Sequence, residues 1–237
     1  MMLWAISDLH LSLGGEKPMD IFGEQWEDHH LKIKENWQKS VENGDTVILG
    51  GDLSWALKLE EAGEDFNFIH GLPGRKVLFK GNHDYWWQSY AKVNKALPAG
   101  ICAVQNNYFL YEGRIALCGT RGWTAPGGEN YTSQDEKIYR RELMRLEMSL
   151  SRAQKDGYSD FIVTLHYPPF TLQGKETGFV DIMRQYNVKI CLYGHLHGVD
   201  QQRVFQGERD RIMFYFISCD FLKFDPLLID LSIFEKS

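Results

Sequence analysis

Short runs of apolar residues recur along the chain, and polar segments that contain glycine separate them. The runs are rich in Val, Ile, Leu and Phe, and apolar and polar positions hardly alternate within them. Such a pattern is typical of strands that are buried on both faces of a sheet. We predict eight strands, namely Leu3–Ile6, Thr46–Leu49, Val77–Phe79, Ile115–Cys118, Phe161–Leu165, Lys189–Tyr193, Ile212–Ile217 and Leu227–Ile233.

Between several of these runs, apolar residues recur every three or four positions, as they do on one face of a helix. Three such stripes lie within Trp26–Val41, Leu59–Ile69 and Tyr139–Ala153. Ser133 and Glu136 match a capping box at the start of the third and longest helix. Its stripe could bind a partner, but packing on the core is the preferred interpretation. Helices and strands alternate early and strands crowd the end, which predicts an α/β layered sandwich with a mixed sheet.

The composition is that of an ordinary soluble globular protein, with 43% hydrophobic and 24% charged residues. The chain has 237 residues and neither an internal repeat nor a long linker rich in Pro, Gly and Ser, so we expect one domain over residues 1–237. The net charge of -6 disfavours nonspecific binding to nucleic acid or to an anionic membrane, although a small groove could still be basic.

Targeting signals and cysteine usage suggest a location. No stretch approaches the roughly 18 apolar residues of a membrane span, and the first residues lack the basic region of a signal peptide. The four cysteines form no C-x-x-C pair and suit buried thiols in a reducing compartment. We therefore expect a cytoplasmic protein without a membrane partner.

Five of the predicted strands end in Asp, Asn or His. The sequence there reads D-x-H at 8–10, G-D at 51–52, G-N-H-D at 81–84, H-Y-P-P at 166–169 and G-H-x-H at 194–197. Any one of these clusters could be an ordinary turn, and G-N-H-D alone could be a turn with an Asx hydrogen bond. Ligands of α/β proteins bind beyond the carboxyl ends of strands, so five such clusters together predict one shared crevice.

The spacing within two clusters also suggests how they bind. In an extended segment, residues two apart project to the same side. We therefore predict that Asp8 and His10 form one two-pronged clamp, and that His195 and His197 form another. Three of the clusters contain a glycine before the polar residues, where a missing Cβ permits tight turns and close approach of the backbone.

The ordered set D-x-H, G-D, G-N-H-D, H and G-H-x-H resembles the calcineurin-like metallophosphoesterase superfamily, over Asp8 to His197. The resemblance implies a four-layer αββα sandwich in which two mixed β-sheets pack face to face, whereas the residue pattern leaves the number of sheets open. It also implies two divalent metal ions. One is assigned to Asp8, His10, Asp52 and His197, and the other to Asp52, Asn82, His166 and His195, with Asp52 bridging. Oxygen and nitrogen ligands without thiolate suit Mn²⁺, which we expect, or Fe or Zn²⁺.

The chemistry that this resemblance implies is hydrolysis of a phosphomonoester or phosphodiester by a metal-bound hydroxide. Two metal ions can hold the phosphoryl oxygens and lower the pKa of a bound water toward about 7. His83 is implied to be the general acid that protonates the leaving alkoxide, and Asp84 to orient His83.

One motif departs from a large branch of the superfamily. Protein Ser/Thr phosphatases carry G-D-x-x-D-R-G, whereas residues 51–55 here read G-D-L-S-W and the Arg of that motif is missing. A phosphoprotein substrate is therefore in doubt, and the chain is more similar to the compact bacterial branch of predicted phosphohydrolases. We expect a small phosphoester as substrate.

Two further segments and two further functions stay open. In the loop at 119–131, Arg121 could clamp a phosphate and Trp123 could stack on a base, or the loop could be a structural connection. We predict that Tyr85, Trp86 and Trp87 open a helix and pack inward. A nuclease is disfavoured because no stripe of Lys and Arg is present. A non-catalytic scaffold of the same fold is disfavoured because the seven ligands and His83 are intact.

Overall fold

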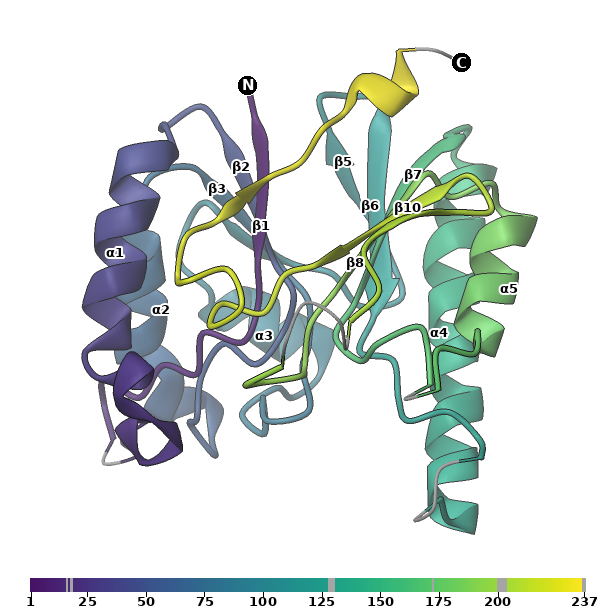
Figure 1. Ribbon diagram of the computed structural model, residues 1–237. Helices are drawn as coiled ribbons and strands as arrows, with labels where there is room; N and C mark the ends of the chain where they lie inside the picture. The colour runs from purple at the N-terminus through teal and green to yellow at the C-terminus, as the bar shows by residue number, and fades with distance from the viewer. Residues whose placement is uncertain (16, 18, 128–130, 172, 200–203, 236–237) are drawn as a thin grey trace.

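A computed structural model describes residues 1–15, 17, 19–127, 131–171, 173–199 and 204–235. Two β-sheets lie face to face, with α1 and α2 outside one sheet and α4 and α5 outside the other (Figure 1). This is the four-layer αββα sandwich that the resemblance implied. Both sheets are mixed, since parallel strands form the centre of each and antiparallel strands lie at edges.

The first sheet has the strand order β11-β1-β2-β3-β4. Its strands are β1 (Leu3–Ile6), β2 (Thr46–Leu49), β3 (Arg75–Leu78), β4 (Ile101–Ala103) and β11 (Leu227–Leu228). The helices on its side are α1 (His29–Ser40), α2 (Gly63–His70) and α3 (Tyr90–Ala96), with the short 3₁₀ helices η1 (Asp20–Phe22), η2 (Glu24–Trp26) and η3 (Leu59–Ala62). β1 and β2 match their predicted bounds.

The second sheet has the strand order β5-β6-β7-β8-β10-β9. Its strands are β5 (Phe109–Tyr111), β6 (Ile115–Thr120), β7 (Asp160–Leu165), β8 (Ile190–Tyr193), β9 (Gly207–Arg209) and β10 (Ile212–Phe216). Outside it lie α4 (Ser133–Lys155) and α5 (Gly178–Gln185). No helix in the part of the chain that the structure describes is both long and apolar enough to cross a membrane.

Three apolar clusters hold the layers together. One lies between the first sheet and its helices, one between the second sheet and its helices, and the third between the two sheets. In β2, Val47 faces the helices while Ile48 faces the other sheet, and both are fully buried. Burial on both faces explains why the strand sequences show so little alternation.

Several predicted elements differ in detail. The predicted strand Leu227–Ile233 pairs only over two residues, because Asp230 accepts the Ser232 N–H at 2.9 Å and the chain turns into the 3₁₀ helix η5 (Ser232–Phe234). β4, β5 and β9 were not predicted; each has three residues, which is too few to give a periodic pattern. The amphipathic helix α5 was also not predicted.

Two helix starts lie elsewhere than predicted. The capping box of α4 is formed by Thr132 and Asp135, one residue before the predicted pair: the Asp135 N–H donates to Thr132 Oγ1 at 3.2 Å, and the Thr132 N–H donates to Asp135 Oδ2 at 2.9 Å. Tyr85–Trp87 is not helical, and α3 begins at Tyr90. Trp86 and Trp87 are buried as expected, whereas Tyr85 is exposed.

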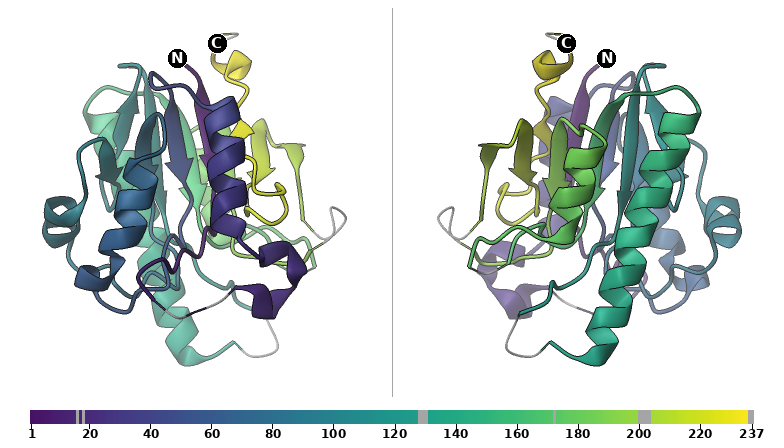
Figure 2. Two further views of the ribbon diagram at one scale, coloured as in Figure 1. Left: turned by 90° about the vertical axis from the view of Figure 1, so that its left-hand side faces the viewer. Right: turned by 90° about the vertical axis from the view of Figure 1, so that its right-hand side faces the viewer.

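The parallel strands of both sheets run in the same direction, and their carboxyl ends form the lower edge of the molecule in Figure 1. α4 is the longest helix, and its first turns extend beyond this edge (Figures 1 and 2). Loops from both sheets and one helix therefore surround the place where the polar clusters were predicted to meet.

Candidate metal centre

The predicted ligands come together at the carboxyl edge of the two sheets. Three of the clusters follow β1, β2 and β3 in the first sheet, and the other two follow β7 and β8 in the second. Two groups of side chains there have ligand atoms within 4.8 Å of one another, namely Asp8, His10 and His197, and Asp52, His166 and His195. These groups match the two sets that the resemblance implied.

The first group joins loops that are 187 residues apart in the chain. His10 Nε2 lies 3.1 Å from His197 Nε2, and His197 Nε2 lies 3.7 Å from Asp8 Oδ1. Asp8 and His10 are buried, while a third of the His197 side chain is exposed. The group is thus open to solvent on the His197 side.

The second group is centred on His166 Nε2. This atom lies 3.3 Å from Asp52 Oδ2, 3.2 Å from His195 Nδ1 and 2.7 Å from Asn82 Oδ1. Asn82, the remaining predicted ligand, therefore belongs to this group. Four potential metal-ligand atoms, one each from Asp52, Asn82, His166 and His195, therefore lie close together.

Asp52 lies between the two groups. Its Oδ2 atom is 3.3 Å from His166 Nε2 in the second group and 3.8 Å from His10 Nε2 in the first. Its other oxygen, Oδ1, accepts the backbone N–H of His83 at 2.7 Å. One carboxylate oxygen is therefore placed where it could be shared by two cations.

The donor chemistry fits a pair of divalent ions. Buried carboxylates and imidazoles face one another, and His10 Nδ1 is buried without a hydrogen-bond partner among the described residues. Buried acceptors that converge in this way repel one another unless a cation lies between them. Carboxylate, amide and imidazole ligands without thiolate suit Mn²⁺, Fe or Zn²⁺.

Several ligands are fixed from behind. Asp8 Oδ2 accepts hydrogen bonds from the hydroxyls of Ser7 and Ser218, the latter at 2.8 Å. His166 Nδ1 donates to the Gly50 carbonyl at 3.2 Å, so its Nε2 atom faces the other ligands of the second group. Such contacts orient ligands and select the tautomer that can bind a metal.

His197 has the corresponding partner in Asp220, whose Oδ1 lies 3.2 Å from His197 Nδ1. Sequence reasoning missed Asp220 and Ser218. A signal for them was present, since the segment Ser218–Asp220 follows the apolar run Ile212–Ile217 just as the five recognised clusters follow theirs. It was overlooked because it contains no histidine.

The backbone of the ligand loops is strained. Asp8, His10, Asp52 and His195 have φ angles of 61°, 45°, 50° and 78°, in the left-handed region that residues with a Cβ seldom adopt. The extended conformation predicted for these segments is therefore wrong. Asp8 and His10 do share a group, but His195 and His197 turn toward different groups.

Two glycines make room for these carboxylates. A Cβ on Gly81 would overlap Asp52 Oδ1, and a Cβ on Gly194 would overlap Asp8 Oδ2 and Ser7 Oγ. The predicted close approach of the backbone at these two glycines is confirmed. The loops can enclose the carboxylates only because neither position has a side chain.

Burial and neighbouring charges set the pKa values of the imidazoles. Burial lowers the pKa of His10 to about 3, and burial together with the nearby His166 lowers that of His195 to about 4. Burial also acts to lower the pKa of His166, but the Asp52 and Asp8 carboxylates outweigh it and raise the pKa to about 9. Burial acts to raise the pKa of Asp52, but the His166 and His10 imidazoles outweigh it and hold this pKa well below its usual range.

His83 lies beside the first group. Its ring centroid is 5.7 Å from that of His10 and 4.6 Å from that of Trp55, and Trp55 stacks on His10 at 4.8 Å. Burial lowers the pKa of His83. Its Nδ1 atom is buried and has no hydrogen-bond partner in the described residues.

The Asp84 carboxylate makes no hydrogen bond to the His83 ring among the described residues, unlike the orienting role that the resemblance implied. Its carboxylate accepts N–H hydrogen bonds from Gly81 at 2.7 Å, Asp52 at 2.9 Å and Leu53 at 2.9 Å. It also accepts from the Ser54 N–H at 3.4 Å and the Trp86 indole at 3.0 Å. Asp84 is fully buried, because both oxygens point into the loop that follows β2. It joins this loop to the loop that follows β3.

Arg121 and Trp123 lie next to the second group. The Arg121 carbonyl accepts the N–H groups of His166 and Tyr167, at 3.0 and 2.9 Å. Its guanidinium lies 4.4 Å from the centre of the Trp123 ring, which is 5.0 Å from Tyr167, and Tyr167 stacks on His195 at 3.9 Å. Residues 128–130 of the predicted substrate loop lie outside the described residues.

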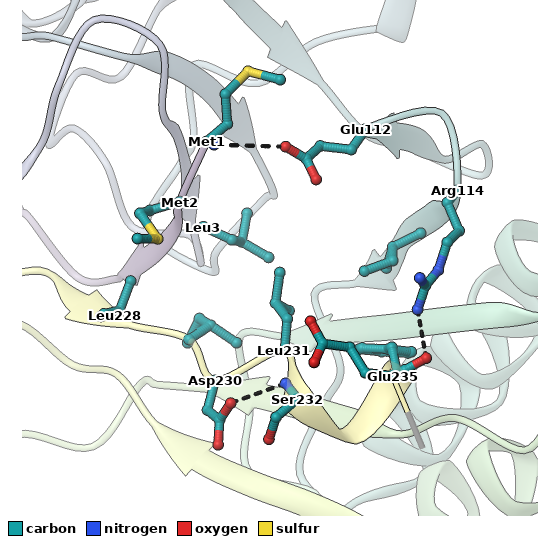
Figure 3. Close-up of a pocket in the computed structure, with 13 residues that line it drawn as sticks. Met1, Met2, Leu3, Glu112, Arg114, Leu228, Asp230, Leu231, Ser232 and Glu235 are labelled. Carbon is teal, nitrogen blue, oxygen red and sulfur yellow. Dashed lines mark hydrogen bonds and ion pairs between the residues drawn. The ribbon is translucent and has the colours of Figure 1, made fainter. Parts of the chain in front are cut away.

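A separate hollow of about 560 Å³ lies at the opposite edge of the sheets. Figure 3 shows Met1, Glu112, Arg114, Leu231 and Glu235 around it. None of its 13 lining residues is a predicted site residue. It shares no chemistry with the candidate metal centre.

The comparisons with known proteins agree with this geometry. The family model for calcineurin-like phosphoesterases matches residues 1–199, and the chain belongs to this family. Membership implies metal-dependent hydrolysis of a phosphoester. The chain is also 35% identical over 89 residues to the gene 66 protein of Mycobacterium phage L5; the match covers 34% of this chain and 39% of the phage protein.

Two solved structures show the same fold. One is a protein of unknown function from Aquifex aeolicus, which is 19% identical with a TM-score of 0.54; the match covers 96% of this chain and 95% of that one. The other is the phosphopantetheinyl hydrolase of Mycobacterium tuberculosis, 15% identical with a TM-score of 0.58, where the match covers 92% of this chain and 88% of that one. At such identities the likeness shows the fold alone.

Proposed function

We propose that this protein is a dinuclear metal-dependent phosphohydrolase that cleaves a small phosphomonoester or phosphodiester. The observation that carries the proposal is the position of Asp52 Oδ2, within 3.8 Å of imidazole nitrogens from both ligand groups. One ion would be held by Asp8, His10, Asp52 and His197, and the other by Asp52, Asn82, His166 and His195. Mn²⁺ is the proposed metal.

The bound ions would neutralise the phosphoryl oxygens and lower the pKa of a water molecule, so that a nucleophile exists near neutral pH. The protein supplies the ligands in a fixed arrangement, because Ser7, Ser218, Gly50 and Asp220 hold them from behind. Asp84 fixes the backbone that carries Asp52. A preorganised site of this kind needs little rearrangement when the reaction occurs.

His83 is the proposed general acid. Its ring is beside the first ligand group, and its unpaired Nδ1 leaves it free to reorient toward a leaving oxygen. Proton donation to that oxygen is typically worth about 10²–10⁴-fold in rate. Because Asp84 does not contact the ring, Trp55 and His10 are the neighbours that position it.

The substrate is proposed to be a small molecule in the cytoplasm, without a nucleic-acid or membrane partner. The net charge of -6 supports the absence of a nucleic-acid or membrane partner. The four free cysteines suit a reducing compartment such as the cytoplasm. Arg121 is proposed to contact a phosphate and Trp123 an aromatic part of the substrate. Arg121→Ala is accordingly expected to raise KM without changing the metal content.

The proposal is tested on protein freed of metal with a chelator and then supplied with Mn²⁺, Fe²⁺ or Zn²⁺. Hydrolysis of a mono-aryl and a bis-aryl phosphate is measured, and bound metal is counted by elemental analysis. We expect two ions per chain and metal-dependent turnover, and expect Asp52→Asn to lose both. Asp181→Asn, at an exposed position of α5, is the control. A single bound ion, or full turnover by Asp52→Asn, would disprove a shared carboxylate.

A further inference from the structure

A group of cationic side chains surrounds one buried carboxylate beside the metal centre. Glu142 of α4 is fully buried, and Thr120 donates to it at 2.5 Å. Three guanidinium groups also face it: Arg145 at 2.9 Å, Arg121 at 3.4 Å and Arg141 at 3.5 Å. The single Glu142 carboxylate therefore forms ion pairs with three guanidinium groups.

The three arginines carry more positive charge than the single carboxylate that they share. We call Arg121, Arg141 and Arg145 the basic cluster.

The basic cluster adjoins the second ligand group. The Arg121 carbonyl accepts the N–H of His166 at 3.0 Å. Arg141 and Arg145 pair with Glu142, which accepts a hydrogen bond from Thr120 at the carboxyl end of β6. The cluster therefore lies where a molecule bound at the metal centre could reach it.

Donors in the cluster are left over. Arg121 Nε is buried without a partner in the described residues, and 14% of the Arg121 side chain is exposed. Arg141 and Arg145 are 49% and 31% exposed, so their remaining N–H groups can reach solvent. Guanidinium groups with unused donors match the oxygens of a phosphate, and a dianion would relieve the repulsion among the cations.

We propose that the basic cluster binds a second phosphate group of the substrate, so that the substrate is a small bisphosphorylated molecule. The inference rests on the proposed function, which places the scissile phosphoester at the metal centre. The acidic net charge of the chain, -6, favours a small molecule over nucleic acid.

The test compares adenosine 5′-monophosphate with adenosine 3′,5′-bisphosphate, as inhibitors of initial rates of aryl phosphate hydrolysis and as ligands that raise the Tm. With Mn²⁺ present, we expect the bisphosphate to bind at least about tenfold more tightly. This preference should disappear in Arg141→Gln and in Arg145→Gln. Arg140→Gln is the matched control, because Arg140 of α4 is exposed and pairs with Glu136.

The outcomes separate the two proposals. If aryl phosphate is hydrolysed but both nucleotides bind equally, the second-phosphate site is wrong and the proposed function stands. If no hydrolysis occurs but the bisphosphate still raises the Tm further, and only in proteins with an intact cluster, the site stands and the proposed function fails. A preference that survives in both cluster variants overturns the assignment, as does tighter binding of a single-stranded oligonucleotide than of the bisphosphate.

Discussion

Asp84 offers the sharpest test of how this site is built. The superfamily resemblance implied that it orients His83, whereas the structure has it joining the loops that follow β2 and β3. The two roles predict different results for Asp84→Asn. An orienting residue would affect turnover and leave stability unchanged, but a residue that joins two loops would affect stability and metal binding first.

The magnitude follows from the five N–H donors around Asp84. The amide of Asn keeps one acceptor oxygen and turns an NH₂ toward the donors of the other. If it takes the place of Oδ2, the N–H groups of Gly81 and Asp52 lose their acceptor, at 2.7 and 2.9 Å. A buried donor without a partner costs about 1–3 kcal/mol, so the two donors together should cost about 2–6 kcal/mol. The free energy of unfolding of most domains is about 5–15 kcal/mol, so a loss in the lower half of this range leaves a folded variant.

The assay is urea denaturation at pH 8 in the presence of a chelator. Burial beside Asp52 raises the pKa of Asp84 to about 6, and pH 8 keeps its carboxylate ionised. Without metal, a difference in the free energy of unfolding between variant and wild type reflects the lost hydrogen bonds and not a difference in metal binding. Asp181→Asn is the control and should change the free energy of unfolding by less than about 0.5 kcal/mol. A second titration should show weaker binding of Mn²⁺ to Asp84→Asn, because Asp52 is no longer held.

One result would refute this reasoning. If Asp84→Asn unfolds at the same urea concentration as the wild type and binds two Mn²⁺ ions, yet turns over as slowly as His83→Ala, then Asp84 acts through His83. The side chain of His83 would have to rotate toward Asp84 when substrate binds. The hydrogen bonds from Asp52, Leu53 and Gly81 would then contribute little to stability.

Three other predictions follow from single contacts. His83→Ala should keep both metal ions by elemental analysis and lose about 10²–10⁴-fold in kcat; loss of metal would contradict its role as an acid. Asp220→Asn should weaken Mn²⁺ binding about 10–100-fold in calorimetry, because His197 loses the carboxylate that orients it, and unchanged affinity would contradict this. Burial acts to raise the pKa of Asp45, but three N–H donors outweigh it and lower the pKa, so Asp45 stabilises the fold above pH about 3.8 and this is lost on acidification. Asp45→Asn should therefore flatten the fall in urea stability from pH 5 to 3, whereas parallel curves would argue against it.

The sequence predicted strands best where they are buried on both faces. Thr46–Leu49 was predicted with its observed bounds because every residue is apolar or β-branched and a glycine ends the run. Three-residue edge strands such as Gly207–Arg209 give no such signal, since pairing with a neighbour alone makes them strands. The number of sheets followed from the superfamily resemblance, because a single strand sequence does not state which sheet it joins.

The candidate ligands could be predicted because five clusters of metal-binding residue types follow strands, but their geometry could not. Extended segments were assumed for residues 8–10 and 195–197, and the left-handed conformations at Asp8, His10 and His195 arise from tertiary contacts. The Asp84 contacts are mostly with main-chain N–H groups, which every sequence has. The sequence also gives no sign that Glu142 is buried among three arginines, because the fold brings Arg121 to the helix that carries Glu142.

The strain and the charges of the site have one consequence in common. A residue held in a sparsely populated conformation costs about 1–3 kcal/mol, and four of the ligands are held in one. The buried carboxylates of Asp8 and Asp52 add repulsion to this cost. The hydrogen bonds from hydroxyls to Asp8 and from N–H groups to Asp84 offset the strain and the repulsion. The metal ions offset them further when they are bound. Metal binding should therefore stabilise the whole fold, because an ion that binds only the folded chain shifts the unfolding equilibrium.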